Sequence, residues 1–548
     1  MPMPERALTL YRNGSVYSAA DPFASAMLVD GGTVAWLGSE QAASSIADSS
    51  MRIVDLDGAL VAPGFVDSHV HLSDTGEALA SLDLSGVRSA AGLLEALESA
   101  AGAGDGGTAG VLRGHGWDES RWDDQTLPTS EELARAAGGR AVFLTRVDVH
   151  SALVSPALAA SAGLSGLDGM DDGGPLAVRE ALSAARAAAR PTDPDDIRAL
   201  HSAALAHAAA TGHVAVVEQA APHLGGADDL RALAARGGAA DEPEVLAYWG
   251  QLVGSAREGR EVLDGLGAPV LGLAGDLTVD GSIGSRTALL RADYADAPGH
   301  RGHGYLTAGQ IGEHVAACTE LGVQAGFHVI GDGGLDRVLD GFRRAADAVG
   351  SDRVRAAGHR LEHAEMVGEA EAAALAALAV TVSAQPLFDA AWGHAGGLYE
   401  RRLGSRREGM NPFARLLAAG VPVCFGSDSP VCAMSPWDTV RACLTHSDPD
   451  QRISARAAFI GHTRAAWRAL RHADPLMGQL VPGAPASFAV WRADELMVQV
   501  ADDRVQAWST DPRARTPLLP ALDTENDPEC LQTVHRGREL YRRSGFGA

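Results

Sequence analysis

The chain has 548 residues, of which 46% are hydrophobic and 21% charged, a composition typical of soluble globular proteins with room for a large domain and a smaller one. Its formal net charge of −25 disfavours binding to nucleic acid and to anionic membrane surfaces. The sequence contains no lysine, so arginine supplies every strongly basic side chain.

The N-terminal sequence lacks the apolar core of a signal peptide, and no run of about 18 apolar residues predicts a membrane span. Five cysteines occur without a CxxC pair, which is typical of reduced thiols. We therefore expect a cytoplasmic protein with neither nucleic acid nor a membrane as partner.

Residues 1–60 alternate short apolar runs with turns and predict a small β-subdomain. Asn13-Gly14 is a hairpin signal within it. Residues 478–548 repeat the pattern of short strands and Gly-Pro turns. The simplest organisation is one composite β-sandwich domain built from both ends of the chain, with a large domain at 61–477 inserted between them.

An apolar strand after a Pro-Gly turn ends in His69-Val70-His71. Residues two apart on a strand face the same side, so the two imidazoles project together and can bind one metal ion. A bare histidine pair at a strand end is also a common surface feature. The metal interpretation therefore requires further ligands at the ends of later strands.

Residues 75–210 contain helical stretches but no regular alternation, which predicts an insertion or lid. From residue 211 strands and helices alternate, and with the histidine strand the strand candidates number eight. This pattern predicts an α/β fold, a TIM-like (β/α)8 barrel with its chemistry at the carboxyl ends of the strands. The later strand candidates lie at 213–220, 244–250, 271–281, 323–332, 359–365, 380–386 and 421–430.

Three more candidate ligands lie on later strands: His328 on the fifth, His363 on the sixth and Asp428 on the eighth. With His69 and His71 they form a donor set suited to one or two divalent metal ions, zinc first. Each residue alone has a structural alternative, since a histidine can serve as a hydrogen-bonded strand end and Asp428 can cap the next turn. The joint pattern favours the metal.

These residues lie in segments that resemble the amidohydrolase superfamily, and more narrowly amidohydrolase family 3, the YtcJ-like proteins, which include N-substituted formamide deformylases. The resemblance covers essentially the whole chain. It implies a metal-bearing barrel with a composite β-domain, and it is compatible with a homodimer. The matching segments are PGFVDSHVHL, GHGWDESRWDDQTLP, FLTRVDVHSALV, VDGSIGSRTALL, FHVIGD, HRLEHAE, SAQP, GSDSPVCAMSPW, GQLVPGAPASFAV and TVHRGRELY.

The resemblance further implies a hydrolase acting on C–N bonds other than peptide bonds, the EC 3.5 type, with a small-molecule amide or formamide as substrate. A metal would activate water, and Asp428 would accept its proton and deliver it to the leaving nitrogen. The implied metal ligands are His69, His71, His328, His363 and Asp428. Alternatives are hydrolysis of a cyclic amide, amidine or ester, or a catalytically silent scaffold or regulatory protein.

The fourth strand departs from the superfamily pattern. Members with two metals often bridge them with a carboxylated lysine, which is excluded here because the chain has no lysine. Asp276 aligns with that position and can either bridge two metals or orient a ligand histidine. Asp280, in Val-Asp-Gly, is the competing candidate, although Asp-Gly more often forms a turn.

Substrate-binding candidates come from the same resemblance, and several have structural alternatives. The segment with Trp117 can be a capped loop around a buried indole, Arg286 can form a structural ion pair, and Gln385 can satisfy a hydrogen bond inside the barrel. Val149, where relatives often have glycine, weakens any transfer of substrate specificity. The candidates are Trp117, Asp118, Arg146, His150, Arg286 and Gln385.

Overall fold

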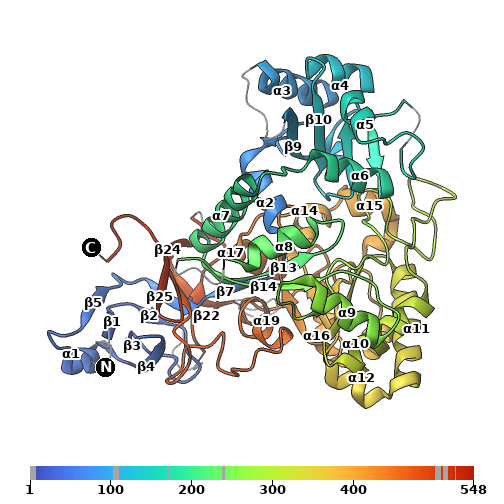
Figure 1. The fold of residues 1–548 in the computed structure, drawn as a ribbon. Coiled ribbons are helices and arrows are strands. Elements are labelled where there is room, and N and C mark those ends of the chain that lie inside the picture. The colour runs from blue at the N-terminus through green and yellow to red at the C-terminus, as the bar shows by residue number, and fades with distance from the viewer. Residues whose placement is uncertain are drawn as a thin grey trace.

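The computed structural model describes residues 8–102, 110–170, 173–236, 241–499, 508–509, 516–524 and 526–547. A central α/β region occupies the middle of the molecule (Figure 1). The segment from α3 to α6 projects from it as a separate lobe, and strands from both ends of the chain lie together on another side (Figure 1).

The central strands are all parallel and form one sheet of three and one of five, in the orders β14-β13-β7 and β15-β16-β17-β18-β19. The predicted α/β set of eight strands is therefore present. Backbone hydrogen bonds connect the sheets, from Leu271 N to Ala247 O (2.8 Å) and from Asp428 N to His69 O (2.9 Å). Closure into one barrel stays a prediction. The strands are β7 (Phe65–Val70), β13 (His213–Ala220), β14 (Glu244–Trp249), β15 (Gly272–Leu273), β16 (Gln324–Val329), β17 (Arg360–His363), β18 (Thr381–Ala384) and β19 (Val423–Phe425).

Three of the central strands are buried along their whole length. Every residue of β7, β13 and β16 is buried, as expected for parallel strands that are covered on both faces. The fourth strand is shorter than the predicted 271–281, because β15 covers only Gly272–Leu273. Gly275 has a φ of +82°, a left-handed conformation that ends the extended run.

Helices separate and cover the central strands (Figure 1). The sequence determines where α10 begins, because Thr307 and Gln310 form a capping box that satisfies backbone N–H groups of its first turn. Within the described residues, no helix combines the length and apolarity needed to cross a bilayer. The helices are α8 (Gly226–Ala234), α9 (Ala256–Leu266), α10 (Ala308–Leu321), α11 (Asp332–Val349), α12 (Ser351–Ala357), α13 (Glu369–Ala377), α14 (Pro386–Trp392), α15 (Leu398–Leu403), α16 (Phe413–Ala418), α17 (Pro436–Leu444), α18 (Ala455–Gly461) and α19 (Arg464–Ala469).

The insertion is more regular than predicted. It contains a mixed sheet in the order β12-β11-β10-β9-β8, with β9 and β10 parallel and β10 and β11 antiparallel. Its apolar core explains this regularity, since side chains of α3, α4 and the strands pack together. The elements are β8 (Leu82–Asp83), β9 (Val111–Trp117), β10 (Ala141–Arg146), β11 (Ser151–Val154), β12 (Leu176–Val178), α2 (Leu72–Ala80), α3 (Ala90–Gly102), α4 (Ser130–Ala136), α5 (Pro156–Ser161), α6 (Arg179–Ala189) and α7 (Pro194–Ala210).

Strands from both ends of the chain share the sheet β2-β6-β20-β24-β25, and further sheets have the orders β4-β3-β1-β5 and β22-β21-β23. The predicted Asn13-Gly14 hairpin is wrong. Asn13 is left-handed (φ 62°), but β1 pairs with β3 and β5 while β2 pairs with β6. The domain boundaries stay predictions. The elements are β1 (Leu8–Arg12), β2 (Ser15–Val16), β3 (Ala26–Asp30), β4 (Thr33–Gly38), α1 (Glu40–Ile46), β5 (Arg52–Asp55), β6 (Leu60–Pro63), β20 (Phe488–Arg492), β21 (Leu496–Gln499), β22 (Trp508–Ser509), β23 (Leu519–Pro520), β24 (Glu529–His535) and β25 (Arg538–Arg542).

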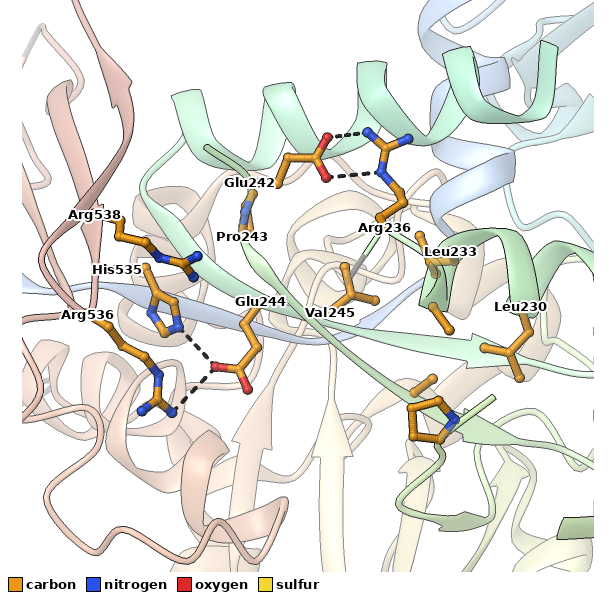
Figure 2. Close-up of a pocket in the computed structure, with 13 residues that line it drawn as sticks. Leu230, Leu233, Arg236, Glu242, Pro243, Glu244, Val245, His535, Arg536 and Arg538 are labelled. Carbon is orange, nitrogen blue, oxygen red and sulfur yellow. Dashed lines mark hydrogen bonds and ion pairs between the residues drawn. The ribbon is translucent and has the colours of Figure 1, made fainter. Parts of the chain in front are cut away.

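A cavity lies where the amino end of β14 meets the turn between β24 and β25 (Figure 2). Arg236 pairs there with Glu242, and Glu244 Oε2 lies 2.9 Å from His535 Nε2 and 3.7 Å from Arg536 Nη2. These charged groups neutralise one another. The cavity is thus a polar junction at the opposite end of β14 from the predicted metal ligands.

Candidate metal centre

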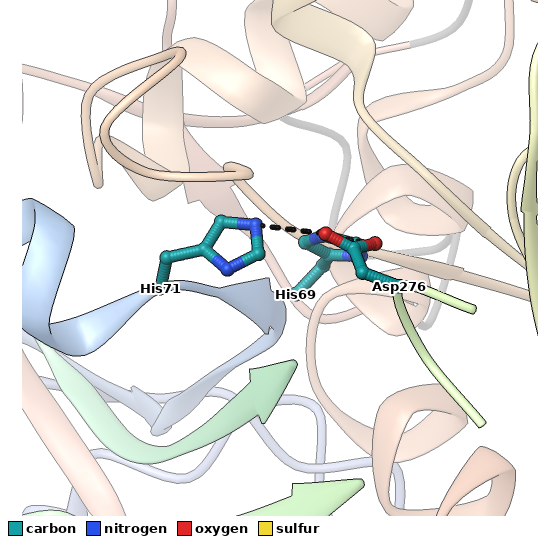
Figure 3. Close-up of side chains that lie close together, drawn as sticks. All are labelled: His69, His71 and Asp276. Carbon is teal, nitrogen blue, oxygen red and sulfur yellow. Dashed lines mark ion pairs between the residues drawn. The ribbon is translucent and has the colours of Figure 1, made fainter. Parts of the chain in front are cut away.

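Two imidazoles and two carboxylates converge at the carboxyl end of β7. His69 Nε2 lies 3.2 Å from Asp428 Oδ1 and 3.6 Å from Asp276 Oδ1. His71 Nε2 lies 3.3 Å from Asp428 Oδ1 and 3.2 Å from Asp276 Oδ2, and Figure 3 shows the two imidazoles with Asp276. Ligand atoms around a tetrahedral zinc ion are separated by about 3.3 Å, given metal–ligand bonds of about 2.0 Å. We call these four residues the four-ligand group.

Backbone pairing brings Asp428 to the histidines. Asp428 N donates to His69 O (2.9 Å), and His71 N donates to Ser429 O (3.0 Å). The buried carboxylate of Asp67 strengthens this junction, because its Oδ1 accepts from His69 N (3.2 Å) and from Ser427 N (2.8 Å). Sequence reasoning missed Asp67, although it lies in the PGFVDSHVHL segment two residues before His69.

Two further side chains contact the ring nitrogens of predicted ligand histidines. Glu362 Oε2 lies 2.9 Å from His69 Nδ1, and Gln385 Oε1 lies 2.8 Å from His363 Nδ1. An imidazole that donates its Nδ1–H presents the Nε2 lone pair to a metal. Gln385 therefore contacts a predicted ligand, His363, which matches the hydrogen-bonding alternative considered for it. Glu362, the residue before His363, was missed.

His363 and His328 extend the site along β16 and β17. Ligand atoms of His69, His363 and Asp428 all lie within 4.8 Å of one another. The His328 ring is centred 4.5 Å from that of His363, although His328 joins neither of the ligand groups that the described residues form. The structure thus places all six predicted ligands in one region, with His328 and His363 beside the four-ligand group.

The residues fit a divalent metal ion on two further observations. Four buried atoms of the four-ligand group have no hydrogen-bond partner, namely His69 Nε2, His71 Nδ1, Asp276 Oδ1 and Asp428 Oδ1. Burial alone would lower the pKa of His69, yet the carboxylates of Asp428 and Asp276 raise it to about 10. The carboxylates therefore favour positive charge at the centre of the group, the condition for binding a cation.

Asp280 occupies a different environment from Asp276. Its carboxylate is fully buried and accepts hydrogen bonds from the backbone N–H groups of Leu289 (2.8 Å), Ile330 (2.9 Å) and Gly331 (2.8 Å). These bonds use its oxygens to attach the loop after β15 to the end of β16. Asp280 is therefore not placed to bind the metal, and the geometry favours Asp276.

Trp117, Asp118 and Arg146 lie inside the insertion. Trp117 is only 1% exposed, and its Nε1 donates to Leu144 O (2.8 Å). Arg146 Nη2 donates to Asp118 Oδ1 (3.0 Å), and both side chains are buried. This placement does not support the predicted contact of these residues with substrate, because the indole is buried and Arg146 is engaged in ion pairs with carboxylates of the insertion.

His150 and Arg286 lie in different surroundings. The His150 ring is centred 5.1 Å from that of His328 and lines the cavities beside the ligands, as expected for a substrate-binding residue. Arg286 Nη2 instead donates to Asp296 Oδ2 (2.7 Å) on an exposed part of the loop after β15. The ion-pair alternative therefore describes Arg286.

Two cavities adjoin the ligands. The wide cleft, of about 580 Å³, is lined by His71, Asp276 and His328 among other residues. The narrow pocket, of about 20 Å³, borders His328, His363 and Asp428 and has room for about one water molecule. Its remaining walls combine apolar side chains with the polar groups of Asp148, Ser282 and Glu365. The apolar walls of the narrow pocket are Ile283, Ile330, Phe388, Trp392, Leu398, Tyr399 and Val431.

The chain is similar to several known proteins over most of its length. Protein LONG AFTER FAR-RED 3 of Arabidopsis thaliana is 27% identical over 88% of this chain and 86% of its own length. The N-substituted formamide deformylase of Arthrobacter pascens is 24% identical over 82% of this chain and 87% of its own. A solved structure, an uncharacterized metal-dependent hydrolase from Pyrococcus horikoshii, aligns with a TM-score of 0.69 and 26% identity, covering 89% of this chain and 98% of that one. The sequence model of the amidohydrolase family matches residues 52–541, and the chain therefore belongs to the amidohydrolase family.

Proposed function

We propose that the protein is a metal-dependent hydrolase that cleaves amide- or formamide-type C–N bonds of a small molecule, with zinc as the first candidate metal. The observation that carries this proposal is the spacing of the four-ligand group, 3.2 to 3.6 Å between imidazole nitrogens and carboxylate oxygens. Family membership supports hydrolysis, and similarity to a formamide deformylase supports the bond type. Family membership also supports closure of the eight central strands into a (β/α)8 barrel.

The metal would lower the pKa of a coordinated water and polarise the substrate carbonyl. Asp428 Oδ1 lies 3.2 Å from His69 Nε2 and 3.3 Å from His71 Nε2. In this position Asp428 can take a proton from the attacking water and give it to the leaving nitrogen. Glu362 and Gln385 hold His69 and His363 in the ligating orientation. His150 can donate a hydrogen bond to the carbonyl oxygen.

The Asp428→Asn variant tests this assignment. We expect a folded protein whose kcat/KM on the best amide falls by about 10²- to 10⁴-fold, because the amide side chain cannot accept the proton. Elemental analysis should still find metal in the variant. Full activity in a metal-loaded Asp428→Asn protein would remove Asp428 from the mechanism.

A substrate panel separates the proposal from its alternatives. Zinc-supplemented protein should hydrolyse formanilide or acetanilide faster than a cyclic amide, an amidine or a phenyl ester. Preference for one of the latter would keep the hydrolase and change its bond type. Absence of bound metal after supplementation, together with no turnover on the panel, would favour a silent scaffold.

A further inference from the structure

Arg186 differs from the other buried arginines of the described chain in having no carboxylate oxygen within 4.0 Å. Four more arginines are buried, and each of those forms at least one ion pair: Arg113, Arg146, Arg360 and Arg402. A buried cation without a counter-charge is unfavourable unless a partner is supplied. The position of Arg186 identifies where such a partner would come from.

Arg186 belongs to α6 and lines the wide cleft, the same cavity that exposes His71 and Asp276. Its Nη2 donates to Val149 O (2.8 Å), which leaves most of the guanidinium donors for a ligand. The guanidinium therefore shares one cavity with two members of the four-ligand group, His71 and Asp276.

The carboxylates around Arg186 already have partners. Asp74 Oδ1 lies 2.6 Å from Arg190 Nη2, and Glu77 Oε1 lies 3.3 Å from Arg113 Nε. Burial lowers the pKa of Arg186 and Asp74 raises it, but a guanidinium remains charged at neutral pH. The cleft therefore presents a cation whose nearest acidic neighbours are engaged elsewhere.

We propose that Arg186 binds a carboxylate of the substrate, so that the protein acts on amides that carry a carboxylate away from the scissile bond. This inference rests on the proposed function, because it assumes that the wide cleft holds the substrate. The planar guanidinium can bind a carboxylate through two parallel hydrogen bonds. The scissile carbonyl would then lie at His71 and Asp276.

A purely structural role makes a different prediction. Val149 has a φ of 51°, and its carbonyl accepts from Arg186 in the turn before His150. If Arg186 only held this turn, its loss would displace His150 and slow every substrate alike. A substrate-binding role lowers turnover of anionic amides selectively.

The test compares formanilide with its ortho-, meta- and para-carboxylate derivatives, using the zinc-supplemented full-length protein. Wild type should prefer one of the carboxylates in kcat/KM. In Arg186→Gln this preference should fall by about 10- to 150-fold, the effect of losing hydrogen bonds to a charged group. In Arg186→Lys the preference for the carboxylate should lie between the values for wild type and Arg186→Gln. The ratio of the two kcat/KM values is independent of how much of each variant is folded.

Arg113→Gln is the matched control. Arg113 is buried in the same lobe and hydrogen-bonds Ala189 O at the end of α6, but it does not line the wide cleft. Because Arg113→Gln also releases Glu77 near Arg186, the preference for the carboxylate should fall by less in this variant than in Arg186→Gln. Equal kcat/KM for anionic and neutral amides in wild type, or an unchanged preference in Arg186→Gln, would overturn the proposal.

Calorimetric titration with benzoate separates failure of this inference from failure of the proposed function. If no amide is hydrolysed, weaker benzoate binding in Arg186→Gln than in wild type and Arg113→Gln still supports the anion site. Benzoate that binds only to the metal would bind all three proteins equally. Equal or absent binding would overturn the anion site, whatever the protein hydrolyses.

Discussion

Asp276 and Asp280 show how the environment of a carboxylate determines its use. Asp276 faces His69 and His71, and its Oδ1 has no hydrogen-bond partner. Asp280 accepts from three backbone N–H groups. A carboxylate with unsatisfied oxygens beside imidazoles suits a metal, whereas one saturated by backbone donors supports a loop.

We expect Asp276→Ala to bind less metal per folded chain than wild type, because it removes a ligand from the four-ligand group. Asp280→Ala should keep its metal but lose about 1 to 3 kcal/mol of stability, since buried N–H groups are left unpaired. Elemental analysis and urea denaturation check the pair. Unchanged metal content and activity in Asp276→Ala would show that Asp276 is not a ligand.

Gln385 provides a second test at the level of one residue. Its Oε1 lies 2.8 Å from His363 Nδ1. Gln385→Leu keeps the approximate size but removes the acceptor, and we expect metal affinity to fall by about 10- to 100-fold. Competition with a chelator measures this affinity. Affinity equal to wild type would mean that packing alone orients the His363 ring.

At the level of elements, a buried ion network joins the insertion to the central region. Arg146 on β10 contacts Asp118, Glu119 and Asp148, with its Nε 2.8 Å from Glu119 Oε2. Arg402 on α15 reaches the other Glu119 oxygen at 2.8 Å. The network thus fixes the lobe that carries His150 against the helices beside the narrow pocket.

Replacing Arg146 with leucine should lower the free energy of unfolding by about 3 to 5 kcal/mol, because it leaves buried carboxylates without their counter-ion. Arg286→Leu is the comparison, since the side chains of Arg286 and Asp296 are 35% and 26% exposed. Its cost should stay below about 1 kcal/mol. Urea denaturation measures the free energy of unfolding of both variants. An equal loss of stability in Arg146→Leu and Arg286→Leu would contradict a special role for the buried network.

For the whole molecule, buried neutral histidines connect helices to strands. His359 Nδ1 accepts from Ala325 N (2.8 Å), and its Nε2 lies 2.9 Å from Thr319 Oγ1 on α10. Burial lowers the pKa of His359 to about 3, and it lowers that of His314, on the same helix as Thr319, to about 4. Such histidines make the fold sensitive to acid.

Between pH 6.5 and about 3 the unfolded chain binds a proton at His359 and the native chain does not. The free energy of unfolding should therefore decrease as the pH falls through this window, by up to about 1.4 kcal/mol per pH unit for this histidine. His359→Gln should show a shallower decrease in urea midpoint between pH 7.5 and pH 5. The exposed His394→Gln should follow wild type. A decrease as steep in His359→Gln as in wild type would exclude this cause.

Local rules made several features predictable from the sequence. Strand alternation places His69 and His71 on one side, and the order of strands and helices predicted the parallel α/β arrangement that carries His328, His363 and Asp428. Family membership, indicated by motifs along the chain, is confirmed. The absence of lysine excludes a lysine carbamate on composition alone.

Contacts between residues far apart in the sequence were decided only by the tertiary structure. The sequence left Asp276 and Asp280 as competitors, and their partners separate them. Glu362 meets His69, and Arg186 alone among the buried arginines of the described residues lacks a carboxylate, because packing determines which charges approach each other. Spacing along the chain constrains geometry within a strand or a helical turn. Hydrogen bonds and ion pairs depend on where separate elements meet.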